Sequence, residues 1–187
     1  MKKKLVLVVA VVLIAITACA LLVGCVPNRP DKFMATWVKS NNKAMSVGVG
    51  DATLETGIDG NKIIVKTNDE NQTIFEEAKG KLNIYVCLAG KWTAETVELT
   101  DEKAEDYKKT KEEFTKTPES MKAIEEEFDK NFEKKDGKWV GKGIYSIVSF
   151  TIKGNELTME VAEMKIPTKM ILNYKISIPS EAKAALK

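Results

Sequence analysis

The chain has 187 residues, of which 44% are hydrophobic and 30% charged, enough to bury the core of one ordinary domain. Basic and acidic residues nearly balance at a formal charge of +2. There is no histidine, which excludes Ser-His-Asp and Cys-His catalysis and most zinc, copper and iron sites. Only carboxylate, lysine, tyrosine or lone-cysteine chemistry remains.

The first residues have the layout of an export signal. Three lysines, Lys2 to Lys4, precede an apolar run from Leu5 to Gly24. These 20 residues would reach about 30 Å as a helix, enough to cross a bilayer core, so an uncleaved signal anchor is the alternative to cleavage. In both cases the lysines would stay in the cytoplasm and the body would lie outside.

The end of this run resembles the lipobox of bacterial lipoproteins, in the residues Leu22-Val23-Gly24-Cys25. The resemblance implies that a lipid is attached to the thiol of Cys25 and that a peptidase then cuts before it. Ile16-Thr17-Ala18-Cys19 fits the same pattern, but a cut there would keep an apolar stub. A cut before Cys25 leads at once into the polar, proline-broken stretch Val26–Lys32. We therefore predict lipidation at Cys25.

The mature chain differs in charge from the full one. The signal, residues 1–24, carries three lysines and no acid, so its removal lowers the formal charge from +2 to −1. A body without a basic excess is not expected to bind nucleic acid. We expect a short lipidated tether at residues 25–32 and one domain at 33–187, in which Cys87 has no disulfide partner. Arg29 is the only arginine, a lysine bias that resembles Gram-positive proteins.

Alternation and turn signals predict mostly strands before residue 100. Asp59-Gly60 is a strong hairpin signal, because it supplies the positive φ of a tight turn. The expected elements are a strand at Phe33–Lys39, an extended segment at Ser46–Ile58 with a bulge at Gly48-Val49-Gly50, a strand at Ile63–Thr67, a short helix at Asn68–Lys79, a strand through Leu82, Ile84, Val86 and Leu88, and its return at Trp92–Leu99.

The charged segment Thr100–Lys135 predicts two helices. Thr100 is the expected cap of the first, and Thr117-Pro118 the expected start of the second. An apolar stripe on the second would consist of Met121, Ile124, Phe128 and Phe132. Strands are then expected at Trp139–Ile152, Leu157–Met164 and along the alternating Met170 to Ile178, followed by a frayed tail at Ser180–Lys187.

These elements predict an α+β fold: an antiparallel β-sheet or open barrel with a two-helix insertion at about residues 100–135. Gly-x-Trp, at Gly90-Lys91-Trp92 and Gly137-Lys138-Trp139, resembles the first-strand signature of lipocalin-like barrels, which implies a ligand in the barrel mouth. Trp37, Trp92 and Trp139 are the candidate ligand-binding residues. The alternative for each is a place in the core with its N–H satisfied.

Two further groups carry less chemistry. Cys87 is expected to face the side of its strand opposite to Leu82 and Ile84, as a small inert hydrophobe. The acids between Glu125 and Asp136 suggest a calcium-binding loop, but Lys134 occupies the position at which an EF-hand loop needs glycine. We therefore expect no metal, no cofactor and no catalytic residues.

The sequence thus predicts a lipid-anchored lipoprotein on the extracytoplasmic face of the cell membrane, in a Gram-positive cell envelope. Its body would be a non-catalytic ligand-binding or interaction module whose partner is a small molecule or a protein. Two alternatives stay open: a cell-envelope enzyme that uses carboxylates or lysine, and a structural subunit of a membrane complex.

Overall fold

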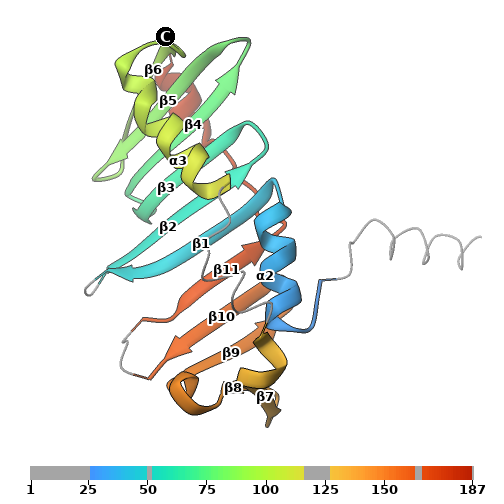
Figure 1. Ribbon diagram of the computed structural model, residues 1–187. Helices are drawn as coiled ribbons and strands as arrows, with labels where there is room; N and C mark the ends of the chain where they lie inside the picture. Colours follow the sequence, from blue (N-terminus) through green and yellow to red (C-terminus); the bar gives the residue numbers. More distant parts are fainter. Residues whose placement is uncertain (1–25, 50–51, 116–126, 163–165, 187) are drawn as a thin grey trace, which may run out of the picture.

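The computed structural model describes residues 26–49, 52–115, 127–162 and 166–186. A single antiparallel sheet dominates this part, with the strand order β6-β5-β4-β3-β2-β1-β11-β10-β9-β8-β7 (Figure 1). The sheet is open, with β6 and β7 at its edges, and the predicted α+β class with an antiparallel sheet is confirmed. The described residues form eleven strands: β1 (Asn42–Val49), β2 (Ala52–Asp59), β3 (Lys62–Asn68), β4 (Asn71–Ala78), β5 (Lys81–Leu88), β6 (Lys91–Glu98), β7 (Phe132–Lys135), β8 (Lys138–Gly141), β9 (Val148–Lys153), β10 (Glu156–Val161) and β11 (Thr168–Leu172).

Helical elements lie before, between and after the strands. They are α2 (Pro30–Lys39), the 3-10 turn η1 (Glu102–Ala104), α3 (Glu105–Thr115), the 3-10 turn η2 (Gly143–Tyr145) and α5 (Ser180–Ala185). Residues 127–131 are also helical.

Two runs of consecutive hairpins build the sheet and meet at its centre. Strands β1 to β6 step outward to one edge, and the chain then crosses through η1, α3 and helical residues 127–131 to the other edge. Strands β7 to β11 lead back, and β11 pairs with β1, with Ala44 opposite Ile171. The predicted helical insertion is therefore the crossing that joins the two edges of the sheet.

Glycine-containing turns set the register of the hairpins, as the sequence predicts. The turn at Asp59-Gly60 places Ile58 opposite Ile63, and Gly60 has a φ of 62°. In the turn from β5 to β6, both Ala89 and Gly90 have positive φ, 50° and 76°. Such turns match the right-handed twist of the flanking strands.

Neighbouring strand residues enter two separate hydrophobic cores. Ile63 and Phe75 pack with α2 and α3 on one side of the sheet, here called the inner face. Ile64 and Ile74, their neighbours in sequence, belong to a second cluster on the outer face. Because successive side chains of a strand point to opposite faces, this half of the sheet is buried on both sides.

The C-terminal segment covers the outer face. Strand β11 ends at Leu172, because Asn173 has a φ of 55° and turns the chain off the sheet. Ile176 and Ile178, predicted to continue the strand, instead pack on the outer face without regular structure. The tail predicted to fray forms α5, and its Ala182 is fully buried against β5 and β6.

The predicted strand at Phe33–Lys39 is wrong, because these residues belong to α2. Pro30 and Asp31, predicted as part of the tether, form the first turn, where proline loses no hydrogen bond and an acid suits the helix dipole. Phe33 and Trp37 lie four residues apart on one side of the helix and face the inner core.

The predicted helix at Asn68–Lys79 is also wrong. Asn68 builds a turn, in which its Oδ1 accepts a hydrogen bond from the backbone N–H of Glu70 at 3.0 Å. Strand β4 follows, with Ile74 and Phe75 buried on opposite faces. Burial on both faces removes the apolar–polar alternation by which a strand is usually predicted.

Further boundaries differ from the prediction. The bulge expected at Gly48-Val49-Gly50 is instead the end of a hairpin in which Val49 lies opposite Ala52; Gly50 lies outside the described residues. The cap of η1 is Asp101 and not Thr100. The segment Trp139–Ile152, which was predicted to be extended, contains β8 and β9, separated by η2.

The second predicted helix ends earlier than expected. Strand β7 starts at Phe132, where the helix was predicted to run on to Lys135. The rings of Phe128 and Phe132 are stacked, with centroids 4.9 Å apart, so the apolar stripe persists across the change of structure. Thr117-Pro118, Met121 and Ile124 lie outside the described residues.

Candidate functional site

The body of the protein begins directly after the predicted lipidation residue. Cys25 lies outside the described residues, but Val26, the next residue, already packs against the inner core. Only the four residues 26–29 separate Cys25 from α2, which starts at Pro30. The connection is thus shorter than the predicted tether of residues 25–32.

Arg29 fixes this junction to the body. Its guanidinium donates to both carboxylate oxygens of Asp31, at 3.0 and 3.1 Å, and forms an ion pair with Asp129 at 3.1 Å. The guanidinium carbon also lies 5.4 Å from the ring centre of Phe128 and 5.7 Å from that of Trp139. Asp31 is only 1% exposed, so the bidentate pair compensates a buried charge. The pKa of Arg29 is raised by its bonds to both acids.

A small cavity lies between the end of α2, α3 and the inner face. Its volume is about 60 Å³, room for about two water molecules, whereas pockets for drug-sized ligands start at about 300 Å³. Ile58 and Ile63 of the sheet form its apolar wall, and Lys43, Tyr107 and Lys111 supply polar groups. The site can hold water or a small anion, but no larger ligand fits without movement of the helices.

Lys43 brings a buried ammonium to this cavity. It is 2% exposed, and its Nζ donates to the backbone carbonyl of Val38 at 2.7 Å, near the end of α2. Its Nζ also lies 4.7 Å from the ring centre of Trp37 and 5.8 Å from that of Phe114. Burial lowers the pKa of Lys43. A cation at a helix C-terminus and over aromatic rings is compensated without a carboxylate.

Tyr107, Lys111 and Glu77 form a second polar group, which ties α3 to β4. The hydroxyl of Tyr107 donates to Glu77 Oε2 at 2.6 Å, and Lys111 Nζ lies 2.9 Å from the same oxygen. The bond from Tyr107 and the ammonium of Lys111 lower the pKa of Glu77, whereas burial and the bond to Glu77 raise that of Tyr107. Glu77 is therefore ionised and Tyr107 protonated at neutral pH, so this pair holds the helix in place and is not poised for proton transfer.

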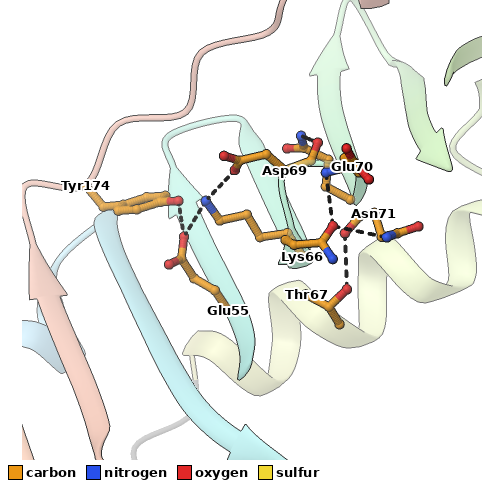
Figure 2. A network of polar contacts seen from close by, with 9 residues as sticks. Glu55, Lys66, Thr67, Asp69, Glu70, Asn71 and Tyr174 are labelled. Carbon is orange, nitrogen blue, oxygen red and sulfur yellow. Dashed lines mark hydrogen bonds and ion pairs between the residues drawn. The ribbon is translucent and has the colours of Figure 1, made fainter. Parts of the chain in front are cut away.

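A polar network on the outer face holds the C-terminal segment (Figure 2). The hydroxyl of Tyr174 donates to Glu55, and Lys66 Nζ lies 3.5 Å from Glu55 and 3.6 Å from Asp69. Burial and the bond to Glu55 raise the pKa of Tyr174. Gly57 makes room for the ring of Tyr174, because a Cβ there would overlap it. This network fastens the chain after β11 and offers no open site.

The structure places the three predicted ligand-binding tryptophans in three separate parts of the molecule. Trp37 is 3% exposed on the inner face, where its Nε1 donates to the carbonyl of Ala44 at 2.9 Å. Trp92 packs on the outer-face cluster, and Trp139 lies beside Phe128, with ring centres 5.1 Å apart. None of the three lines the cavity described above.

The remaining predicted residues carry no visible chemistry. Cys87 is a free cysteine, 1% exposed. It lies on the same strand side as Tyr85, as expected, since Tyr85 belongs to the outer cluster and Ile84 to the inner one. Among the described residues no group of acids or cysteines could hold a metal ion.

Two residues that matter here were not predicted. Arg29 could have been found, because a lone arginine two positions before an aspartate is an unusual feature in a lysine-rich chain. Lys43 stands in an ordinary polar stretch, and only the packing of α2 and α3 reveals its burial.

No helix within the described residues is long and apolar enough to cross a membrane. No protein-family model matches the chain, and no curated protein or solved structure is significantly similar to it.

Proposed function

We propose that this protein is an extracytoplasmic lipoprotein, cut before Cys25 and anchored by a lipid on that residue to the cell membrane of a Gram-positive bacterium. The body is a non-catalytic ligand-binding or interaction module at the outer face of the membrane. The Leu22-Val23-Gly24-Cys25 motif supports the anchor, and the fold supports the module.

The observation that carries this proposal is the short junction between anchor and body. Four residues span at most about 14 Å, and the last of them, Arg29, is held by Asp31 and Asp129. A lipid on Cys25 would therefore hold the folded body against the membrane. Such an arrangement suits a protein that binds its small-molecule or protein partner close to the membrane surface. The body itself would not extend far into the cell wall.

Two features of the inner face favour a module over an enzyme. The cavity at Lys43 holds about 60 Å³ and a more open hollow at Ile84, Val86 and Glu95 about 280 Å³, and both lie below the volume of about 300 Å³ at which pockets for drug-sized ligands start. The nearby pair of Tyr107 and Glu77 is locked by hydrogen bonds in fixed protonation states. The open sheet offers its edges and surfaces for contacts instead.

The anchor is tested by the intact mass of the membrane-extracted protein and of two matched variants. We expect the wild type to start at Cys25 and to carry acyl groups. Cys19→Ala should be identical in processing, since Cys19 is discarded with the signal. Cys25→Ala should keep residues 1–24 and carry no lipid.

Two results would contradict the proposal in different ways. Cleavage and lipidation of Cys25→Ala would move the anchor to Cys19. A wild-type mass that still includes residues 1–24 would mean an uncleaved signal anchor.

A further inference from the structure

The loop between β8 and β9 exposes two large hydrophobic side chains. Ile144 is 87% exposed and Ile147 is 48% exposed. Between them Tyr145 turns inward, with its ring centre 5.6 Å from that of Phe132. Gly141 permits this course of the loop, because a Cβ there would overlap the carbonyl of Tyr145. The loop is thus held by its tyrosine while both isoleucines point away from the core.

This loop lies at the same end of the molecule as the predicted anchor. The carboxylate of Asp129 binds Arg29, and the carbonyl of Asp129 accepts a hydrogen bond from Lys142 Nζ at 3.3 Å. Arg29 follows Cys25 by four residues, and Lys142 precedes Ile144 by two. Figure 1 shows α2 starting beside β9, in the half of the sheet that ends with β8 and β7.

The charge around the loop suits an anionic surface. Residues 130–153 contain six lysines and two acids. Three of these lysines, Lys130, Lys135 and Lys138, form ion pairs with nearby glutamates, which weakens their contribution. When the partners Glu127 and Glu160, which lie outside this range, are counted as well, six lysines still exceed four acids. Anionic headgroups attract such a segment within a Debye length of the membrane.

We infer that the η2 loop, residues 143–147, touches the phospholipid bilayer beside the anchor, with Ile144 and Ile147 inserted at the level of the headgroups. The inference depends on the proposed lipidation of Cys25, which brings this end of the body to the membrane. A single flexible attachment would let the body rotate, and a second contact fixes which surfaces face outward. Exposed apolar side chains next to lysines are the usual composition of such an interfacial contact.

A polarity-sensitive fluorophore on an introduced cysteine tests this contact. The full lipidated protein with Ile144→Cys is labelled and reconstituted into vesicles of phosphatidylglycerol and phosphatidylethanolamine that contain a lipid-borne quencher. Leu88→Cys is the matched control, because Leu88 is 66% exposed and lies at the turn between β5 and β6, in the other half of the sheet. Cys87 is 1% exposed and should not react with the label.

We expect the probe at residue 144 to shift to the blue and to be quenched severalfold more strongly than the probe at residue 88. Replacing phosphatidylglycerol by a zwitterionic lipid should weaken the quenching. A probe at residue 144 that stays as solvent-exposed as the one at residue 88 overturns the inference.

Two further outcomes separate the proposals. A protein that does not float with the vesicles refutes the anchor, and with it this inference. A probe at residue 144 that is shielded in native membranes, but solvent-exposed on pure lipid vesicles that the protein does bind, shows that a protein partner covers the loop and overturns the assignment to the bilayer.

Discussion

Asp31 and Lys43 are charged side chains buried almost completely, at 1% and 2% exposure, and the protein compensates them differently. The carboxylate of Asp31 has a bidentate partner in Arg29. The ammonium of Lys43 donates to one backbone carbonyl and lies over two aromatic rings. Substitution in the Asp31 pair should therefore destabilise the protein more than substitution of Lys43, because removing one partner of a buried pair is far more harmful than removing an isolated buried charge.

For Arg29→Lys we expect a loss of about 2 kcal/mol in the free energy of unfolding. Lysine keeps the charge but loses the second hydrogen bond to Asp31 and the stacking on Phe128 and Trp139. Asp129→Asn is the control, since Asp129 is exposed and its ion pair should be worth less than about 1 kcal/mol. Urea unfolding of the body from Val26 onward measures both. Equal losses in the two variants would mean that the buried pair of Arg29 and Asp31 contributes no more to the free energy of unfolding than the exposed pair of Arg29 and Asp129.

For Lys43→Met we expect stability within about 1 kcal/mol of the wild type at pH 7, or above it. Burial lowers the pKa of Lys43 from its usual 10.5, so between the lowered value and 10.5 the unfolded chain binds more protons than the folded one. The wild type should therefore gain stability relative to Lys43→Met as the pH rises from 7 to 10. Lys91→Met, at an exposed position, should show no such trend. A difference between wild type and Lys43→Met that is independent of pH would contradict this.

At the scale of single elements, α5 is a helix of only six residues, of which Ala182 is buried. Ala182 is fully buried where α5 packs on β5 and β6, and it belongs to the outer cluster with Ile64, Ile74 and Tyr85. The segment before it is held by Asp59, which accepts the backbone N–H of Ile176 at 3.1 Å. Packing and not intrinsic propensity must hold so short a helix, because isolated helices of this length are unstable.

For Ala182→Asp we expect a loss of about 3 kcal/mol in the free energy of unfolding, because the substitution buries a carboxylate without a partner. Ala184→Asp is a matched control on the exposed side of the same helix and should change stability by less than about 0.5 kcal/mol. Hydrogen exchange should show faster exchange in residues 174–186 of Ala182→Asp, with the inner face protected. Equal exchange in both variants would show that α5 contributes little to the outer face.

The residues of the turns made the hairpins predictable from the sequence. Other elements could not be predicted correctly from their sequence pattern. The hairpin at Asp59-Gly60 and the one between Leu88 and Trp92 follow from local backbone preferences and were predicted correctly. Strand β4 was misassigned because Ile74 and Phe75 are buried on opposite faces of the sheet. Helix α2 was misassigned although Phe33, Met34 and Trp37 follow the helical period. The path of the chain after Leu172 depends on Asn173 at positive φ and on Gly57, which leaves space for Tyr174, and neither is visible as a sequence pattern.

At the scale of the whole molecule, the strand order could not be derived from the sequence. The pairing of β1 with β11 joins residues more than a hundred positions apart, such as Ala44 and Ile171. The inner core then extends across this seam, from Leu82 in β5 to Phe150 in β9. One continuous core predicts that the protein unfolds as one cooperative unit. From the sequence alone, the two runs of hairpins, β1 to β6 and β7 to β11, could be mistaken for two domains.

The three tryptophans can test this cooperativity, because they report from separate places. Trp92 lies in β6, at one end of the sheet, Trp37 lies in α2, and Trp139 lies in β8, near the other end. In variants that keep only one tryptophan, with the others changed to Phe, the fluorescence transition in urea should coincide with the far-UV circular dichroism transition of the same variant. The comparison within one variant cancels the stability change that the substitutions themselves produce. A Trp139 signal that changes at lower urea than the backbone signal would mean that strands β7 to β9 unfold first. That half of the sheet, which carries the junction at Arg29, would then be a separate unit, and the seam between β1 and β11 would be too weak to couple it to the rest.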